Sequence, residues 1–123
     1  MTDERSTQLK LTVVVVAWTG REPLRLCLRS LLSQVHPEED EIIVARNFAD
    51  DDGRPVHAEF STVTDFRFAR DMTVPKLRAA GFAAAKGNVI AFLEDHCVCV
   101  PGWRDAIMSA HELSVDAVGG YRT

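Results

Sequence analysis

Residues 87–96, Gly-Asn-Val-Ile-Ala-Phe-Leu-Glu-Asp-His, decide the fold of this chain. A glycine ends a helical segment, an apolar strand follows over 88–93, and the strand stops at Glu94, Asp95 and His96. In an open α/β sheet, ligands bind just beyond the carboxyl ends of the strands. Two carboxyl groups and an imidazole at that point favour a site for a cation or an anionic substrate.

Two stretches upstream predict further strands of a parallel sheet. Residues 11–17, Leu-Thr-Val-Val-Val-Val-Ala, form a nearly continuous β-branched run, which is typical of a strand buried on both faces. A shorter apolar run over 41–45 predicts a second buried strand. Between them, apolar residues recur at helical spacing over 24–35 and predict a helix. Thr19 and Glu22 are predicted to form a capping box at its start.

The remaining segments complete an alternating pattern of strands and helices. A helix is predicted over 74–86, another after Pro101 and Gly102, and a last strand over 115–118. One or two short extended pieces are predicted within 56–70. This order is typical of an α/β fold, in which an open, mostly parallel twisted sheet carries helices on both faces, as in Rossmann-like domains.

Length, charge and cysteine content narrow the class of protein. The 123 residues predict a flexible arm over 1–9 and a single α/β domain over 10–123. A net charge of −4 argues against nucleic acid as a partner, because no basic excess is present to neutralise phosphates. No apolar run is long enough to span a membrane. The chain has three cysteines, an odd number, and no export signal. This combination favours a reducing compartment, so a cytoplasmic location is predicted.

Three strand ends are expected to meet at one edge of the sheet. These are residues 17–19, residues 46–47 and residues 94–96. A nucleotide can lie across that edge, with its base near the first two strands and its phosphates near the third. A turn starting at Leu93 would bring Glu94 and His96 to the same side. The other interpretation of residues 94–96 is a solvated junction between a strand and a loop.

Several motifs occur in a fixed order, and together they resemble the amino-terminal half of family 2 glycosyltransferases, which have the GT-A fold. The motifs are Cys-Leu-Arg-Ser-Leu-Leu-Ser-Gln at 27–34, Glu-Ile-Ile-Val at 41–44, Arg-Ala-Ala-Gly at 78–81, Ala-Lys-Gly at 85–87, Ile-Ala-Phe-Leu-Glu-Asp-His at 90–96, Pro-Gly-Trp at 101–103 and Val-Gly-Gly at 118–120. The resemblance covers nearly all of the chain from Leu11 to Gly120.

The resemblance implies inverting glycosyl transfer from a nucleoside-diphosphate sugar with the help of a divalent cation. The metal-binding Asp-x-Asp motif of the family matches Glu94 and His96, so these two residues are the implied metal ligands. Histidine binds Mn²⁺ acceptably and Mg²⁺ poorly, and Mn²⁺ is therefore predicted over Mg²⁺. The implied donor-binding residues are Ala17, Trp18, Thr19, Arg46, Asn47, Arg78, Glu94 and Asp95.

The chain also departs from the family pattern. Arg46 or Asn47 stands where the family places an aspartate that binds the nucleotide base. The family's second half, with the acceptor site and a carboxylate base, is not matched, so the catalytic base is unknown and the chain is expected to be incomplete for catalysis. A homo-oligomer or a completing chain is the expected partner at the open edge of the sheet.

Two other classes of function remain open beside the glycosyltransferase interpretation. One is a non-catalytic nucleotide-binding or partner-binding module on the same scaffold. A phosphoacceptor receiver domain ranks last, because it needs an acidic pair after the first strand. His96, Cys97 and Cys99 are competent zinc ligands, but a fourth ligand is missing at standard spacing. Packing of the two cysteines as small apolar groups is favoured.

Overall fold

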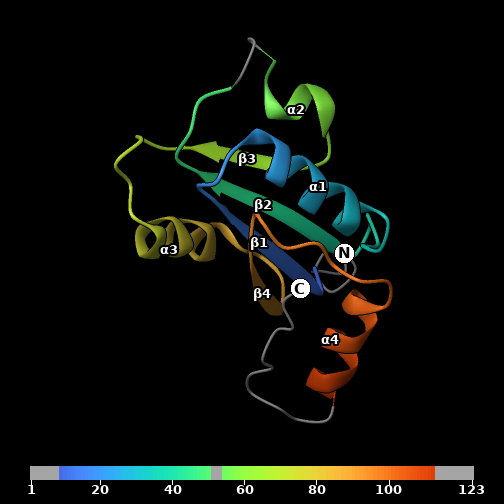
Figure 1. Ribbon diagram of the computed structural model, residues 1–123. Helices are drawn as coiled ribbons and strands as arrows, with labels where there is room; N and C mark the ends of the chain where they lie inside the picture. The colour runs from blue at the N-terminus through green and yellow to red at the C-terminus, as the bar shows by residue number, and fades with distance from the viewer. Residues whose placement is uncertain (1–8, 51–53, 113–123) are drawn as a thin grey trace, which may run out of the picture.

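The computed structural model describes residues 9–50 and 54–112, and within them four parallel strands form one sheet (Figure 1). The strands, in the spatial order β3-β2-β1-β4, are β1 (Leu11–Ala17), β2 (Asp40–Arg46), β3 (Thr64–Arg67) and β4 (Val89–Glu94). The predicted parallel α/β sheet is confirmed. The strand predicted over 115–118 and most of the arm predicted over 1–9 lie outside the described residues.

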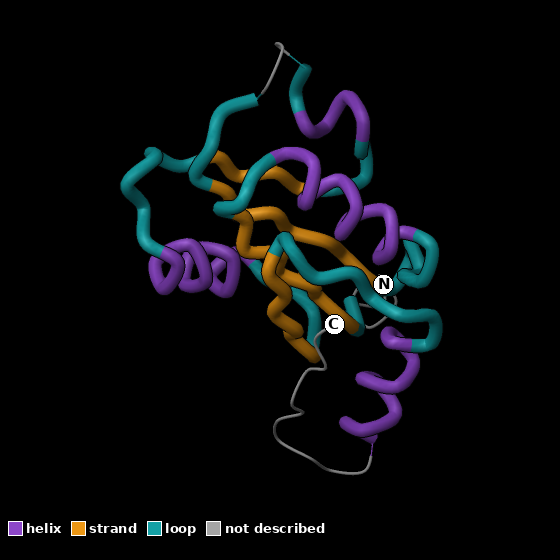
Figure 2. The backbone as a smooth tube through the Cα atoms, viewed as in Figure 1, coloured by secondary structure: helices purple, strands orange, loops and turns teal. Residues whose placement is uncertain are grey.

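Helices cover both faces of this sheet, as predicted (Figures 1 and 2). On one face lie α1 (Arg21–Leu32), α2 (Val56–Glu59) and α4 (Trp103–Glu112); on the other lies α3 (Val74–Ala84). Each helix follows a strand, which is the connection that parallel neighbours require. Within the described part of the chain, no helix is long and apolar enough to cross a membrane.

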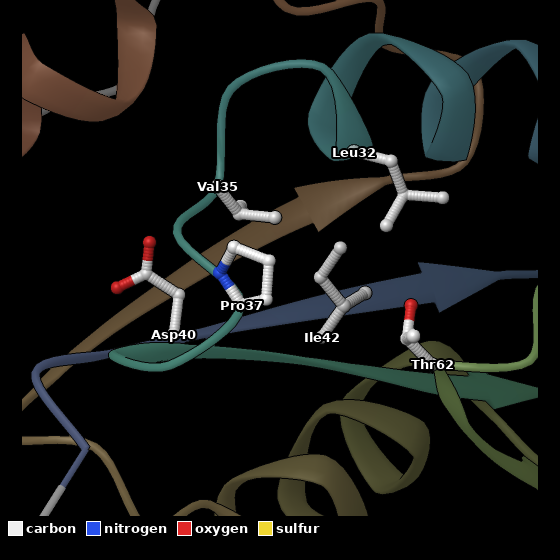
Figure 3. A pocket seen from close by; sticks show the side chains of 6 residues that line it. All are labelled: Leu32, Val35, Pro37, Asp40, Ile42 and Thr62. Atoms are coloured by element: carbon white, nitrogen blue, oxygen red, sulfur yellow. The ribbon is translucent and has the colours of Figure 1, made fainter.

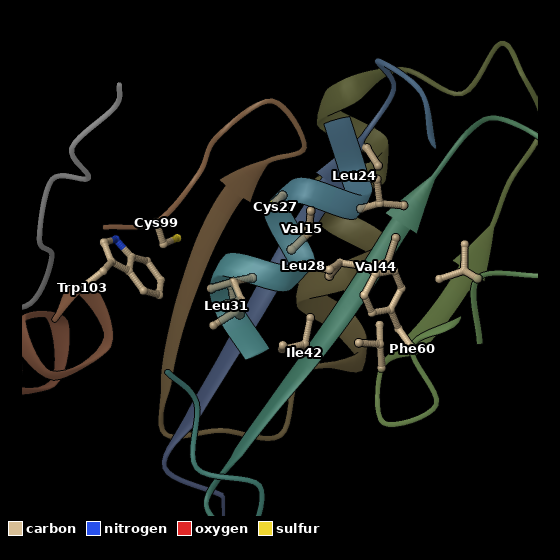
Figure 4. Packing of buried hydrophobic residues seen from close by; sticks show 14 of the residues in the cluster. Val15, Leu24, Cys27, Leu28, Leu31, Ile42, Val44, Phe60, Cys99 and Trp103 are labelled. Carbon is tan, nitrogen blue, oxygen red and sulfur yellow. The ribbon is translucent and has the colours of Figure 1, made fainter. Parts of the chain in front are cut away.

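The core has two layers because successive side chains of a strand point to opposite faces. On the α1 face, Val13 and Val15 belong to the same buried cluster as Leu24, Leu28 and Leu31. Figure 4 shows Val15 beside these leucines. On the α3 face, the buried cluster contains Val14, Val16, Ala45 and Leu77. Both faces of β1 are therefore buried, which explains why its sequence is a continuous apolar run rather than an alternating one.

The segment over 56–70 forms one helical turn, α2, and one strand, β3, where only extended pieces were predicted. Tertiary ion pairs hold this turn in place. Glu59 accepts hydrogen bonds from Arg21 at 3.2 Å and from Arg25 at 2.6 Å, and both arginines belong to α1. These partners lie more than thirty residues away along the chain. Local sequence therefore carries no signal for them.

Gly81 lets α3 approach β1 closely, and its replacement by alanine is expected to destabilise the fold. A Cβ atom at this position would lie 2.3 Å from Val14 Cγ1. Overpacking of this kind costs about 1–3 kcal/mol. Urea unfolding of Gly81→Ala measures the loss, and Gly81→Ala combined with Val14→Ala should recover part of it, because the opposing methyl group is gone. Additive losses in the double variant would contradict this packing.

Candidate functional site

The carboxyl ends of β1, β2 and β4 meet at one edge of the sheet, as the sequence predicts. Ala17 is in register with Arg46, and Val16 with Glu94. Backbone hydrogen bonds continue the ladder past the strands, from Asn47 N to Ala17 O at 3.2 Å and from Asp95 N to Val16 O at 3.1 Å. The three predicted strand ends are thus neighbours in space.

A turn directly after β4 brings Glu94 and His96 face to face. Cys97 N donates to Glu94 O at 3.0 Å and closes the turn. Glu94 Oε1 lies 3.0 Å from His96 Nε2, and the two side chains are 31% and 45% exposed. The Trp18 ring packs against the imidazole edge to face, with 5.6 Å between ring centroids. Trp18, Glu94 and His96 therefore form one accessible cluster, here called the edge cluster.

Asp95 occupies the centre of this turn, and its Oδ1 lies 3.9 Å from His96 Nδ1. Its side chain is fully buried. Thr19 N and Thr19 Oγ1 each donate to it at 2.8 Å, and Gly20 N donates at 3.4 Å. Asp95 therefore ties the loop between β1 and α1 to the end of β4, and this tie holds Trp18 next to His96.

The capping box predicted from Thr19 and Glu22 is wrong. The N-cap of α1 is Gly20, and no side chain caps the helix. The Thr19 hydroxyl is taken up by Asp95, which binds the Thr19 backbone N–H as well. Gly20 has a φ of 142°, a conformation that residues with a Cβ rarely adopt, so a glycine suits this sharp turn.

Glu94 Oε1 and His96 Nε2 contact each other at 3.0 Å as an ion pair. A carboxylate and an imidazole are both possible ligands of a divalent cation, so these are the two residues of the edge cluster that could hold one. Among the residues that the structure describes, no group of three or more His, Cys, Asp or Glu side chains is placed to hold a metal. A cation at this pair would take its other ligands from substrate phosphates and water.

Arg46, one of the predicted donor-binding residues, is buried and fully engaged. It is 2% exposed. Its guanidinium binds both oxygens of Asp65 at 2.9 and 2.8 Å, the Phe48 carbonyl at 2.7 Å and Asp50 at 2.9 Å. Burial alone would lower the pKa of Arg46, but the bonds to Asp65 and Asp50 outweigh it, so the pKa lies above its ordinary value. This arginine joins β2 to β3 and does not reach the edge cluster.

The other two predicted donor-binding residues, Asn47 and Arg78, lie on the α3 side of the edge. Asn47 Nδ2 donates to Met72 O at 2.9 Å and holds the loop before α3 at the end of β2. Arg78 is half-buried in the second turn of α3 and forms no ion pair with a carboxylate of residues 9–50 or 54–112. Neither residue contacts the edge cluster.

Two recesses open at this edge of the sheet. One of about 430 Å³ lies beside His96 and is lined also by Glu22, Pro23, Leu26 and Val98. The other, of about 180 Å³, lies at the ends of β2 and β3, and its lining is Asn47, Phe48, Ala49, Arg67, Phe68, Ala69 and Arg70. A further recess of about 120 Å³ beside Asp40 and Ile42 lies at the amino end of β2, away from the predicted site (Figure 3).

Ser30 and Gln34 position the loop that follows His96, a role that the sequence did not reveal. Ser30 Oγ accepts from Cys99 N at 3.0 Å. Gln34 Nε2 donates to Val100 O at 2.8 Å, and Gln34 Oε1 accepts from Arg104 N at 3.0 Å. Ser30 lies on α1 and Gln34 in the turn just after it, and the spacing of four residues between these two polar side chains in the motif at 27–34 was the available signal.

Of the two cysteines in this loop, Cys99 packs in the apolar cluster on the α1 face. Cys97 and Cys99 are buried, as is Cys27 on α1, and all three are free thiols. Burial raises the pKa of Cys99 to about 11 against an opposing hydrogen bond from Ser30, and burial also raises the pKa of Cys27. A thiol must lose its proton to bind a metal, so this environment disfavours the zinc interpretation.

The fold and the edge cluster define an open α/β domain whose polar side chains gather at the carboxyl ends of its strands. Residues 12–122 match Glycosyl transferase family 2, and the chain belongs to this family. No curated protein matches the sequence.

Solved structures with a similar fold include two of the S. aureus protein TarS. The first, of residues 1–349, superposes with a TM-score of 0.74 at 16% identity, over 93% of this chain and 39% of that one. The second superposes with a TM-score of 0.68 at 16% identity, over 85% and 20%. These similarities show the GT-A type of fold, and this chain spans well under half of either TarS chain.

Proposed function

We propose that this domain binds a nucleoside-diphosphate sugar across the ends of β1, β2 and β4 and serves inverting glycosyl transfer. The observation that carries the proposal is the edge cluster, in which Glu94 and His96 lie 3.0 Å apart beside Trp18 in a family 2 chain. A carboxylate and an imidazole suit one divalent cation, and Mn²⁺ accepts both kinds of ligand.

Each residue of the site has a proposed part in holding the donor. Glu94 and His96 bind the cation, which supplies positive charge to the departing diphosphate. Trp18 packs on the His96 ring and keeps it turned toward Glu94. Arg78, in the second turn of α3, does not contact the edge cluster, and its proposed part is to attract the phosphates at longer range through its positive charge. An acceptor hydroxyl also needs a base, and none of the described side chains is assigned that part.

A non-catalytic module on the same scaffold is the second candidate. The observation that favours it is the buried state of Arg46, which binds Asp65 and Asp50 inside the protein. Arg46 or Asn47 stands where the resemblance implies a base-binding carboxylate. Such a module would bind nucleotide without transferring sugar. The buried thiols are compatible with a reducing compartment, and we propose a cytoplasmic location for either function.

Thermal unfolding with nucleotides and Mn²⁺ tests the proposal. A ligand that binds only the folded state stabilises it by about 2.7 kcal/mol at a concentration of 100 times its Kd. UDP, GDP or TDP should therefore raise the Tm by several degrees with Mn²⁺ present and by much less without it. Glu94→Gln and His96→Gln should abolish the Mn²⁺-dependent part, while Glu38→Gln, an exposed control, should retain it.

Three outcomes test nucleotide binding and separate the two candidates. Flat melting curves with all three nucleotides and Mn²⁺ would overturn nucleotide binding altogether. A Tm rise accompanied by hydrolysis of the donor sugar, followed by mass spectrometry, supports the glycosyltransferase assignment. A Tm rise without turnover of the donor sugar supports the non-catalytic module.

A further inference from the structure

We infer that the recess at the ends of β2 and β3 selects a guanine base, an inference that rests on the proposed function. The recess, here called the arginine recess, is lined by residues 47–49 and 67–70 and has a volume of about 180 Å³. It lies at the same edge of the sheet as the edge cluster, on the β2 side, where the base of a nucleotide spanning that edge would fall.

Two arginines and one asparagine supply the polar side chains in the lining of the arginine recess. Arg67 ends β3, and Arg70 follows three residues later; both are exposed. Neither guanidinium forms an ion pair with a carboxylate in the described part of the chain, and none of the lining residues is acidic. Asn47 also lines the recess, and because its Nδ2 donates to Met72 O, we assign its side-chain oxygen as the acceptor for a ligand.

Arg46 fixes the two arginines in place without competing with them. Its guanidinium points into the protein, where Asp65 and Asp50 hold it. Its backbone carbonyl accepts from Phe68 N at 2.8 Å. This bond holds the segment that carries Arg67 and Arg70 against the end of β2, so their guanidiniums are presented from a supported backbone.

Guanine matches this lining better than the other bases do. It presents two adjacent acceptors, O6 and N7, which suit the planar fork of an arginine. Its N1–H and amino donors suit the oxygen of Asn47. Adenine and cytosine carry an amino donor where guanine carries O6, and an arginine cannot accept from it. Uracil offers a single carbonyl on that edge. Phe48 and Phe68 add aromatic surface.

Calorimetric titration with nucleoside diphosphates tests the inference. The chain is titrated with GDP, UDP, ADP and CDP in the presence of Mn²⁺. We expect GDP to bind at least about tenfold more tightly than ADP or CDP, since a bidentate arginine contact discriminates bases by roughly that factor or more. UDP should fall between them.

The variant Arg67→Met with Arg70→Met identifies the cause of this preference. It should weaken GDP binding about tenfold or more and leave ADP within threefold, so that the preference disappears. Arg29→Met, which removes an exposed guanidinium on α1, should change neither the affinity for GDP nor the affinity for ADP. Melting temperatures of the variants confirm that they are folded, because the two recess arginines have no described ion pairs to lose.

The outcomes separate this inference from the proposed function. Equal or tighter binding of ADP, CDP or UDP would overturn guanine selection while donor binding stands. Equal losses for all four nucleotides in the double variant would also overturn it, since the arginines would then hold phosphates. Absence of binding by every nucleotide would remove the proposed function and the inference with it.

Discussion

Asp95→Ala is expected to lower the free energy of unfolding by about 3 kcal/mol and to abolish nucleotide binding. The Asp95 carboxyl group is fully buried and accepts from Thr19 N, Thr19 Oγ1 and Gly20 N. Alanine would leave these donors without their partner and release the loop between β1 and α1. Trp18 would then lose its place on the His96 ring, and the edge cluster would come apart.

Asp95→Asn distinguishes this positioning role from direct contact with the donor. In one orientation the asparagine oxygen can accept from the two backbone N–H groups, while its amide donates to Thr19 Oγ1. We therefore expect a loss of only about 1 kcal/mol and nearly normal nucleotide affinity. The sequence-based interpretation placed Asp95 among the donor-binding residues; in that case Asn would bind nucleotide poorly although folded normally.

Three measurements complete the experiment on Asp95. Urea unfolding gives the stability of Asp95→Ala, Asp95→Asn and Thr19→Val, the last of which removes only the hydroxyl that donates to Asp95. Calorimetry gives their affinity for the nucleotide. The fluorescence of Trp18, distinguished from that of the buried Trp103, reports whether the loop between β1 and α1 keeps its position. An unchanged stability of Asp95→Ala would contradict the positioning role.

The sequence predicted the sheet well because its strands are specified locally. The β1 strand spans the predicted residues 11–17, and β2 extends the predicted 41–45 by one residue at each end. Strands buried on both faces need apolar side chains at every position, so a short window of sequence suffices. The short β3 has mostly exposed side chains and pairs with β2 alone among the described strands, so its sequence carries a weak signal.

The site was predictable in position but not in the direction of its side chains. Strand ends of a parallel sheet share one edge, and this rule alone placed residues 94–96 beside Trp18. The inward turn of Asp95 depends on Thr19, 76 residues away, and the burial of Arg46 depends on Asp65, 19 residues away. Sequence patterns do not contain such pairings, because they arise only when the strands assemble.

Asp40→Ala is expected to destabilise the fold by about 3–5 kcal/mol, the cost of stranding one charge of a buried pair. Arg104 Nε donates to Asp40 Oδ2 at 2.9 Å, and Arg104 Nη2 donates to Asp40 Oδ1 at 3.0 Å. The Asp40 side chain is fully buried and also accepts from His36 N at 2.8 Å. This pair fastens the start of α4 to the start of β2.

The double variant Asp40→Ala with Arg104→Met shows whether the ion pair itself or the volume of its two side chains contributes to the stability of the fold. Removing both charges avoids the unpaired one, so we expect the double variant to lose less than the sum of the single losses, by about 1–3 kcal/mol in urea unfolding. Asp105→Asn, whose carboxyl group is exposed on the same helix, should stay within about 0.5 kcal/mol of the parent. Additive losses would mean that α4 is held by the packing of Trp103 rather than by this ion pair.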